Sequence, residues 1–346
     1  MNIVLSYLAT ILVFLFIFNI FSIGLNVQFG YAGILNFTII SFMAVGAYFY
    51  AVFAMPPADR SNQIFYILGL HWPWPLATLA GIAASAGFGY LVGLVALKRL
   101  RSDYLAIATL AVGSMLFGLA GNQTQLFDGW SGLFNVVQPF GSLAVGSPTA
   151  FSWIFVGVCG LVMVVIWLFA NRLYRSPLGS VMRAVREDQD VVDAFGKSSF
   201  HIRMVAMVIG AVIVGIGGIL EIQYIGALSP SGWSPSTTFV VWAALLIGGR
   251  ANNLGSFVGS VVVAVLFNQV TRFLPSISPS SAYLVPNLRN LIIGVLVIAV
   301  LWFRPQGLIP ERGGGFLEIP LSSTRGTRMP SGGAGEGARG STVEEV

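Results

Sequence analysis

Charged residues are scarce in this chain. Only 9% of its 346 residues are Asp, Glu, Lys or Arg, whereas roughly a quarter of the residues are charged in an average soluble domain. Hydrophobic residues make up 56% of the chain, and its mean hydropathy is +0.83. A water-soluble protein of this length needs many more polar residues to cover its surface. The composition therefore excludes an ordinary soluble domain and indicates a membrane protein.

Cysteine and histidine are scarcer still. The single cysteine, Cys159, excludes an intrachain disulfide, so cysteine usage does not indicate a redox compartment. His71 and His201 have no second ligand three or four residues away, and a zinc site needs three or four converging ligands. No Ser/His/Asp or Cys/His grouping stands out. We therefore expect no metal, no cofactor and no enzymatic activity in this chain.

Nucleotide and nucleic-acid binding are also disfavoured. The stretch FGKSS (195–199) resembles the end of a phosphate-binding P-loop, but Val191 stands where that motif needs its first glycine. The net charge of +5 does not indicate a nucleic-acid partner, because the basic residues lie beside apolar runs rather than in a patch interleaved with aromatic residues.

Long apolar runs recur along the chain. A bilayer core about 30 Å thick requires about 20 apolar residues per spanning helix. The runs predict an all-α polytopic membrane protein with about nine transmembrane helices, the first of them a retained span rather than a cleaved signal. The expected spans are 3–23, 31–54, 74–97, 103–121, 150–171, 204–222, 236–249, 254–273 and 287–303.

The positions of lysine and arginine predict the orientation. Cytoplasmic loops of membrane proteins carry an excess of positive charge. Placing residues 98–102 inside puts all of the 18 Lys and Arg residues there except Arg60, Arg272 and Arg289. We expect the N-terminus outside, a membrane domain over 1–310 with a cytoplasmic loop at 172–203, and a cytoplasmic tail over 311–346. The tail is rich in Gly, Ser, Thr, Arg and Glu, so we expect it to be disordered.

One internal stretch breaks the apolar pattern. The 28 residues from Ser176 to Arg203, here called the charged segment, hold eight charged side chains between two apolar runs. Ser176 suits a helix N-cap and Pro177 the first helical position, while Gly196 suits a left-handed C-terminal residue. An apolar stripe recurs at helical spacing: Leu178, Val181, Met182, Val185, Val192 and Phe195.

The pattern predicts an amphipathic helix over 177–196, either single or bent into two. Three opposite-charge pairs lie four residues apart, where they are expected to stabilise the helix: Arg183–Glu187, Arg186–Asp190 and Asp193–Lys197. A loop helix that only returns the chain to the membrane is one explanation. The segment is longer than such a return needs, and an apolar stripe with charged borders suits docking in the groove of a partner.

Several stretches resemble one transporter family. The charged segment is similar to the coupling loop of permeases in ATP-binding-cassette (ABC) importers for branched-chain amino acids, LivM type. Five further stretches resemble that family in the same order: GLNVQFGYAGILNFTIISFMAVGAY (24–48), LRSDYLAIATLAVGSML (100–116), DGWSGL (128–133), LLIGGRANNLGSFVGSVVVA (245–264) and RPQGLI (304–309). Val191 and Val192 depart from the family pattern, which has two alanines there.

The resemblance implies a transport subunit with partners. These are a homologous permease subunit, two ABC ATPase subunits that hydrolyse ATP, and an external solute-binding protein, all at a lipid bilayer. The implied substrate is a branched-chain amino acid, with urea, short amides or another small solute as alternatives within the family. The residues expected to couple the chain to an ATPase are Arg183, Ala184, Arg186, Glu187, Asp188, Asp190, Asp193, Ala194 and Gly196.

A substrate pathway is expected along the second span, where glycine and asparagine interrupt the apolar run. Broken helices can line a polar cavity, although small residues also serve helix packing. Ionisable residues within spans are further candidates. Asp103 could instead pair with neighbouring bases, and Glu221 could pair with Arg272 or face interfacial water. The candidate pathway residues are Asn26, Gly30, Gly33, Asn36, Asp103, Tyr104 and Glu221.

The main rival function is an ATP-independent channel or secondary carrier, in which the charged segment is a regulatory loop. Few carboxylates lie within the expected spans, whereas ion-coupled carriers commonly use them. The scarcity disfavours this rival.

Overall fold

The computed structural model describes residues 2–57, 66–99, 102–141 and 148–263, together with parts of 291–311. The chain divides into two units, Met1–Glu311 and Arg312–Val346, and the described residues all belong to the first. Of the expected tail, only Glu311 is described. The expected span at 287–303 and the second half of the span at 254–273 lie largely outside the described residues.

The described part of the chain is mostly helical, with two strands of two residues each, which confirms the all-α prediction. In chain order the elements are α1 (Asn2–Leu25), a turn of π-helix η1 (Asn26–Tyr31), α2 (Ile39–Ala54), α3 (Trp74–Arg99), α4 (Ser102–Asn122), α5 (Thr124–Phe127), β1 (Leu133–Phe134), α6 (Pro148–Arg175), α7 (Pro177–Glu187), α8 (Gln189–Ala194), α9 (Ser199–Ile225), β2 (Ala227–Leu228), the 3₁₀ turn η4 (Pro230–Trp233), α10 (Pro235–Gly248) and α11 (Asn253–Val261).

Five helices among the described residues are long and apolar enough to cross a membrane. They are Val4–Tyr31, Trp74–Lys98, Tyr104–Asn122, Thr149–Arg175 and Ser199–Ile225. The predicted span at 31–54 is helical only over the 16 residues of α2, because residues 32–38 leave the helix. The predicted span at 236–249 corresponds to the 14-residue α10.

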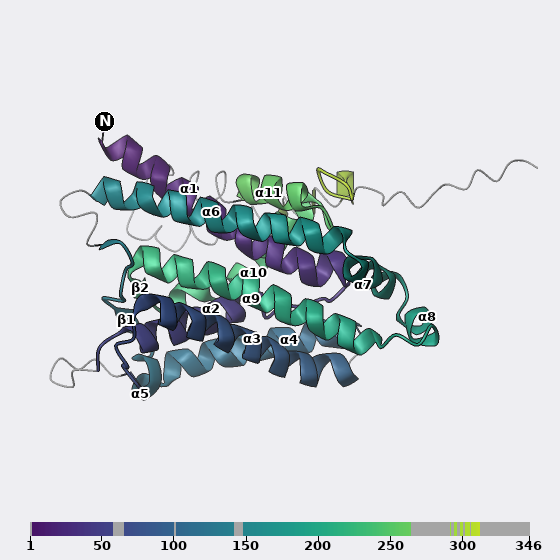
Figure 1. The fold of residues 1–346 in the computed structure, drawn as a ribbon, viewed down its shortest axis with the longest axis horizontal. Helices are drawn as coiled ribbons and strands as arrows, with labels where there is room; N and C mark the ends of the chain where they lie inside the picture. Colours follow the sequence, from purple (N-terminus) through teal and green to yellow (C-terminus); the bar gives the residue numbers. More distant parts are fainter. Residues whose placement is uncertain are drawn as a thin grey trace, which may run out of the picture. The chain divides into compact units, whose positions relative to one another are not determined.

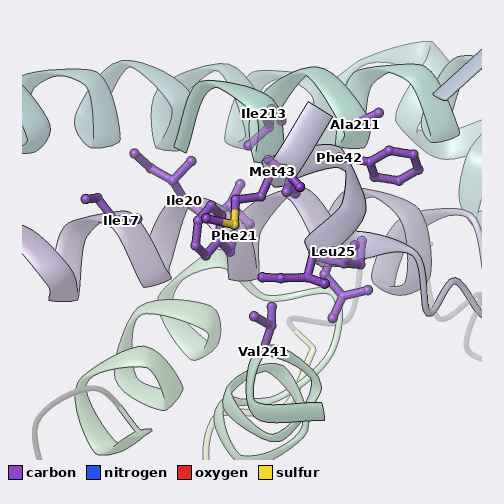
Figure 2. Packing of buried hydrophobic residues seen from close by; sticks show 14 of the residues in the cluster. Ile17, Ile20, Phe21, Leu25, Phe42, Met43, Ala211, Ile213 and Val241 are labelled. Carbon is purple, nitrogen blue, oxygen red and sulfur yellow. The ribbon is translucent and has the colours of Figure 1, made fainter. Parts of the chain in front are cut away.

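Long helices lie side by side, with α9 contacting α1, α2 and α3, and α1 contacting α6 (Figure 1). The short strands β1 and β2 pair antiparallel, Leu133 with Leu228, at the opposite end of α9 from α7 and α8 (Figure 1). The core lies where α1, α2, α9 and α10 meet, and Figure 2 shows Phe21, Met43, Ile213 and Val241 contributed by these four helices.

Glycines set the closest helix contacts. A Cβ atom on Gly218 of α9 would lie 2.4 Å from the carbonyl oxygen of Met43. A Cβ atom on Gly259 of α11 would lie 1.8 Å from the carbonyl oxygen of Ala244 in α10. Small residues at such crossings let membrane helices approach each other backbone to backbone.

Replacing Gly259 tests this packing. Because the Ala244 carbonyl belongs to the backbone, the Gly259→Ala methyl group must push α10 and α11 apart, at a cost of roughly 1–3 kcal/mol. We expect a lower melting temperature for the purified protein in detergent. The control is Gly157→Ala in α6, where no atom lies within 4 Å of the new methyl group. Equal melting temperatures for the two variants would contradict the predicted packing.

Candidate functional site

The charged segment forms two helices, α7 and α8. The Ser176 hydroxyl accepts a hydrogen bond from the Gly179 N–H at 3.2 Å, with Pro177 at the first helical position, as predicted. Gly196 follows α8 with a φ of +78°, where glycine avoids the steric cost that a side chain would bring. The predicted helix bends at Asp188, whose extended backbone (φ −153°) separates α7 from α8.

Asp188 causes the bend by capping the second helix. Its Oδ1 accepts hydrogen bonds from the N–H groups of Asp190 at 2.9 Å and Val191 at 3.2 Å. A carboxylate at this position satisfies amides that have no partner within the first turn.

The predicted apolar stripe is divided between the interior and the surface. Met182, Val185 and Val192 are buried, at 0%, 1% and 6% exposure. Phe195 is 83% exposed, and Leu178 lies at the border with 36%. The inner part of the stripe holds α7 and α8 against the rest of the chain, and Phe195 is left at the surface.

The predicted ion pairs within the charged segment are wrong. The ion pairs of Arg186 join its Nη2 to Glu187 at 2.9 Å and to Glu311 at 3.0 Å, rather than to Asp190. The Arg183 guanidinium lies 4.1 Å from the centre of the Tyr174 ring and donates to the Tyr174 carbonyl at 2.7 Å. Both arginines turn inward, because partners there accept hydrogen bonds from their N–H groups.

Asp193 is held by Ser199 instead of Lys197. The Ser199 N–H donates to its Oδ1 at 2.7 Å and the Ser199 hydroxyl to its Oδ2 at 2.8 Å. These two hydrogen bonds, the backbone one first, lower the pKa of the Asp193 carboxyl below its ordinary value. Asp193 therefore stays ionised and fastens the end of α8 to the start of α9.

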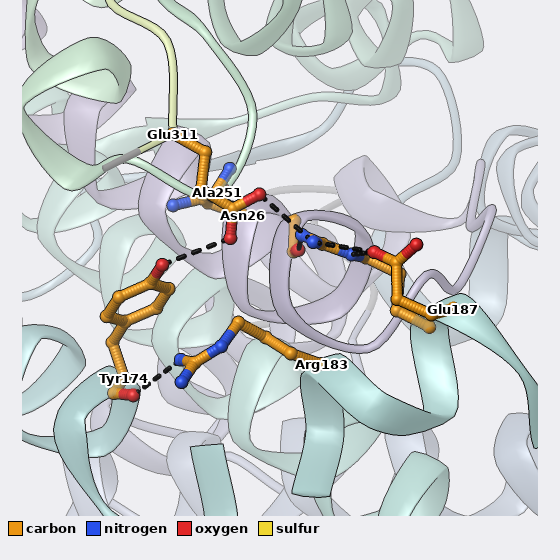
Figure 3. A network of polar contacts seen from close by, with 8 residues as sticks. Asn26, Tyr174, Arg183, Glu187, Ala251 and Glu311 are labelled. Carbon is orange, nitrogen blue, oxygen red and sulfur yellow. Dashed lines mark hydrogen bonds and ion pairs between the residues drawn. The ribbon is translucent and has the colours of Figure 1, made fainter. Parts of the chain in front are cut away.

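Arg186 joins the charged segment to the break in the membrane helices. Its Nη1 donates to the carbonyl of Gly30 in η1. Gly33 has a φ of +68°, and a Cβ atom there would lie 3.0 Å from Cγ of Arg186. Glu311 accepts from Arg186 and from the Tyr174 hydroxyl at 3.0 Å (Figure 3). The structure thus places one predicted coupling residue, Arg186, against two predicted pathway residues, Gly30 and Gly33.

The outer surface of α7 and α8 is acidic. Arg183 and Arg186 are half-buried, whereas the remaining predicted coupling residues are exposed: Ala184, Glu187, Asp188, Asp190, Asp193, Ala194 and Gly196. With the two arginines turned inward, the carboxylates dominate the exposed face. We call this set of seven residues the acidic face.

Asn26 and Asn36, two of the predicted pathway residues, are fully buried. Asn26 accepts from the Ala251 N–H at 2.8 Å and donates to Asn253 at 3.0 Å. Asn36 donates to the Gln28 side chain at 2.9 Å, and its carbonyl accepts from the Trp242 indole at 3.1 Å. A Cβ atom on Gly30 would lie 2.0 Å from Asn26 Oδ1, so the π-helical turn needs glycine there.

The remaining predicted pathway residues lie apart from this cluster. Tyr104, near the start of α4, is 64% exposed. Asp103 lies in α4, and its side chain is outside the described residues. Glu221 is half-buried one turn before the end of α9, and Arg272 lies outside the described residues.

Three polar residues of the cluster were not singled out in the sequence: Gln28, Asn253 and Glu311. Gln28 and Asn253 interrupt apolar runs, and an interruption of this kind can be recognised in the sequence alone. Nothing local marks Glu311. Among the described residues no group of three or more His, Cys, Asp or Glu side chains could hold a metal ion.

Comparison with known proteins assigns the family. The model of the permease components of branched-chain amino acid transport systems matches residues 7–301. The chain belongs to this family. It is a multi-pass membrane protein of the LivM type, as the resemblance in its sequence predicted.

Individual relatives agree with this assignment. The probable branched-chain amino acid transport permease protein LivM of Methanocaldococcus jannaschii is 29% identical over 336 residues, which cover 88% of this chain and 94% of the relative. The high-affinity LivM permease of Salmonella typhimurium is 31% identical over 314 residues, or 85% of this chain and 68% of the relative. The LivH permease of the same organism is 24% identical, over 84% of this chain and 91% of the relative. The comparison with solved structures found no match.

Removing the Arg186 side chain tests the link between α7 and η1. Arg186→Ala removes one hydrogen-bond donor from the Gly30 carbonyl and one from the Glu311 carboxylate. We expect a loss of roughly 1–3 kcal/mol of stability, seen as a lower melting temperature in detergent. Lys197→Ala, which removes an exposed cation from the same segment, is the control and should change stability by no more than about 0.5 kcal/mol. An Arg186→Ala protein as stable as the control would show that the link contributes nothing.

Proposed function

We propose that this chain is the transmembrane subunit of an ABC importer that moves branched-chain amino acids by alternating access. A homologous permease subunit completes the pathway, two ABC ATPase subunits dock on the cytoplasmic side, and an external solute-binding protein delivers the solute. The N-terminus lies outside and the C-terminus inside the cell. Membership of the branched-chain amino acid permease family supports this reading, as do the printed names of the relatives.

The observation that carries the proposal is the position of Arg186 between two environments. On one side it pairs with exposed Glu187 of the acidic face, and on the other it binds the Gly30 carbonyl inside the helix bundle. Val185 and Met182 are buried beside it, so α7 cannot shift without moving what it contacts. A partner that binds the acidic face therefore has a direct mechanical connection to the broken segment between α1 and α2.

The proposed cycle follows from this connection. Closure of the ATPase pair displaces α7 and α8 as rigid bodies, and Arg186 carries the displacement to η1. Rigid-body motion of packed helices is a common basis for two-state transitions. The solute passes along the segment that holds Asn26, Gly30, Gly33 and Asn36, with Asp103, Tyr104 and Glu221 as further pathway residues. The neutral polar side chains of Asn26 and Asn36 suit a zwitterionic amino acid.

Reconstitution separates this function from its rival. The chain is co-purified with its partner permease and ATPases, and uptake of L-leucine into vesicles is measured with the solute-binding protein and with or without ATP. The proposal requires uptake that depends on ATP and ATP hydrolysis that leucine stimulates. Leucine uptake by the permease chains alone would favour an ATP-independent channel or carrier, and uptake of urea or a short amide in its place would reassign the substrate.

Reversing charge on the acidic face tests the docking role. Glu187→Lys combined with Asp188→Asn removes two negative charges and adds one positive charge, while the asparagine keeps an oxygen to cap α8. We expect uptake in vesicles to fall about tenfold or more, with ATP hydrolysis and membrane insertion retained, because the helices still fold but no longer transmit the motion.

Asp188→Asn alone is the control, since it keeps the cap and reverses nothing. It should retain most of the uptake. Normal uptake by the double variant would count against docking at this face.

A further inference from the structure

A polar face runs along the membrane-embedded helix α1 and onto Asn26, the first residue of η1. Asn19, Ser22 and Asn26 lie three and four residues apart, so they share one side of the helix, and each is 0% exposed. The opposite side packs on α9, where a Cβ atom on Gly217 would lie 2.6 Å from Phe21. The polar face of α1 therefore points away from α9.

A matching polar face runs along α11. Asn253, Ser256 and Ser260 have the same spacing and are buried, at 4%, 0% and 0% exposure. Asn26 donates to Asn253 at 3.0 Å, so the two polar faces meet. The two helices pack together, and α11 begins beside the end of α1, so they run antiparallel.

The helical rise sets which residues lie level with each other. Seven residues of α-helix rise about 10 Å, so Asn19 lies as far from the Asn26–Asn253 contact as Ser260 does. By the same reasoning Ser22 lies near the level of Ser256. A seam of polar side chains is thus enclosed between two apolar helices.

Hydrogen bonding along the seam is uneven. At the end near η1 it is saturated, because Asn253 also accepts from the Tyr31 hydroxyl at 2.8 Å and donates to Asn171 at 2.8 Å. Further along, neither amide atom of Asn19 nor the hydroxyl of Ser22 has a hydrogen-bond partner among the described residues.

Unpaired polar groups at this depth are costly. Mutational data put the cost of a buried polar group without a hydrogen bond at about 1–3 kcal/mol. If the seam served only to hold α1 against α11, a leucine at position 19 would pack better than an amide that forms no bond. A buried polar group without a hydrogen-bond partner therefore needs an explanation other than packing, and binding of a polar molecule in another state of the protein provides one.

We propose that Asn19, Ser22, Ser256 and Ser260 form a subsite for the charged head group of a zwitterionic amino acid, which the saturated contacts of Asn26 and Asn253 close at one end. The inference rests on the proposed transport function and names further residues for it. The Asn19 carbonyl accepts from the ammonium group of the solute, and the Asn19 amide and the Ser22 hydroxyl, which have no partner among the described residues, donate to its carboxylate. The hydroxyls of Ser256 and Ser260 already donate to the backbone carbonyls of Asn252 at 3.3 Å and Ser256 at 2.8 Å, so their oxygens serve as acceptors for the ammonium group. The subsite opens when α11 separates from α1 during the transport cycle.

Substitution of Asn19 distinguishes a subsite from a packing contact. In the assembled transporter, Asn19→Leu should lower kcat/KM for L-leucine uptake at least tenfold and leave the melting temperature equal or raised. Asn19→Gln, which keeps the amide, should restore part of the uptake. The control is Asn122→Leu at the exposed end of α4, which should transport normally. Unchanged uptake by Asn19→Leu, or a melting temperature that falls together with uptake, would overturn the subsite.

A thiol-labelling experiment reads the subsite without relying on the solute. With Cys159, the single cysteine, replaced by serine, Asn19→Cys should react with a small charged thiol reagent while the assembled transporter hydrolyses ATP. Ile20→Cys, which faces α9 near Gly217, should stay unlabelled. Labelling at position 19 without leucine uptake would sustain the subsite and refute the proposed substrate. Leucine uptake without labelling at position 19 would refute the subsite and leave the transport function standing.

Discussion

The hydrogen bonds that close the break between α1 and α2 are the constraint on which the rest of this structure depends. A helix interrupted within a membrane exposes amides and carbonyls that lipid cannot satisfy. Here distant side chains supply the partners: Arg186 binds the Gly30 carbonyl and Trp242 binds the Asn36 carbonyl. In turn, the side chain of Asn26, at the start of the break, accepts from the Ala251 amide. The break is therefore also the place where α7, α10 and the start of α11 are joined.

This arrangement explains why a mostly apolar chain places eight of its 31 charged residues in one internal segment of 28 residues. Placing a charged side chain inside a bilayer costs free energy. A helix that lay only on the surface, however, would make no contacts with the interior of the helix bundle. The arginines of α7 turn inward to carbonyl groups, an aromatic ring and Glu311, while the carboxylates of the acidic face remain in water. One segment thus combines an exposed acidic surface with a firm attachment to the broken helix.

Local features of the fold could be predicted from the sequence, and long-range contacts could not. The cap at Ser176, the end of α8 at Gly196 and the long apolar helices depend on residues within a turn or a span of each other. The ion pairs predicted at four-residue spacing are wrong, because Arg183 and Arg186 find better partners in Tyr174, Gly30 and Glu311. The Asn26–Asn253 bond joins residues 227 positions apart, and no local pattern in the sequence indicates it. The sequence pattern allows either one helix or two over 177–196. The cap formed by Asp188 shows that there are two.

Docking of an ATPase subunit on the acidic face is the central claim, and site-specific photo-cross-linking tests it most directly. A photoreactive amino acid at exposed Ala194 of α8, in the assembled transporter in a membrane, should form an adduct with the ATPase subunit. The same probe at Val95, which is 74% exposed on α3, should not. An adduct at Ala194 with lipid alone, or none with the ATPase in any nucleotide state, would contradict the account.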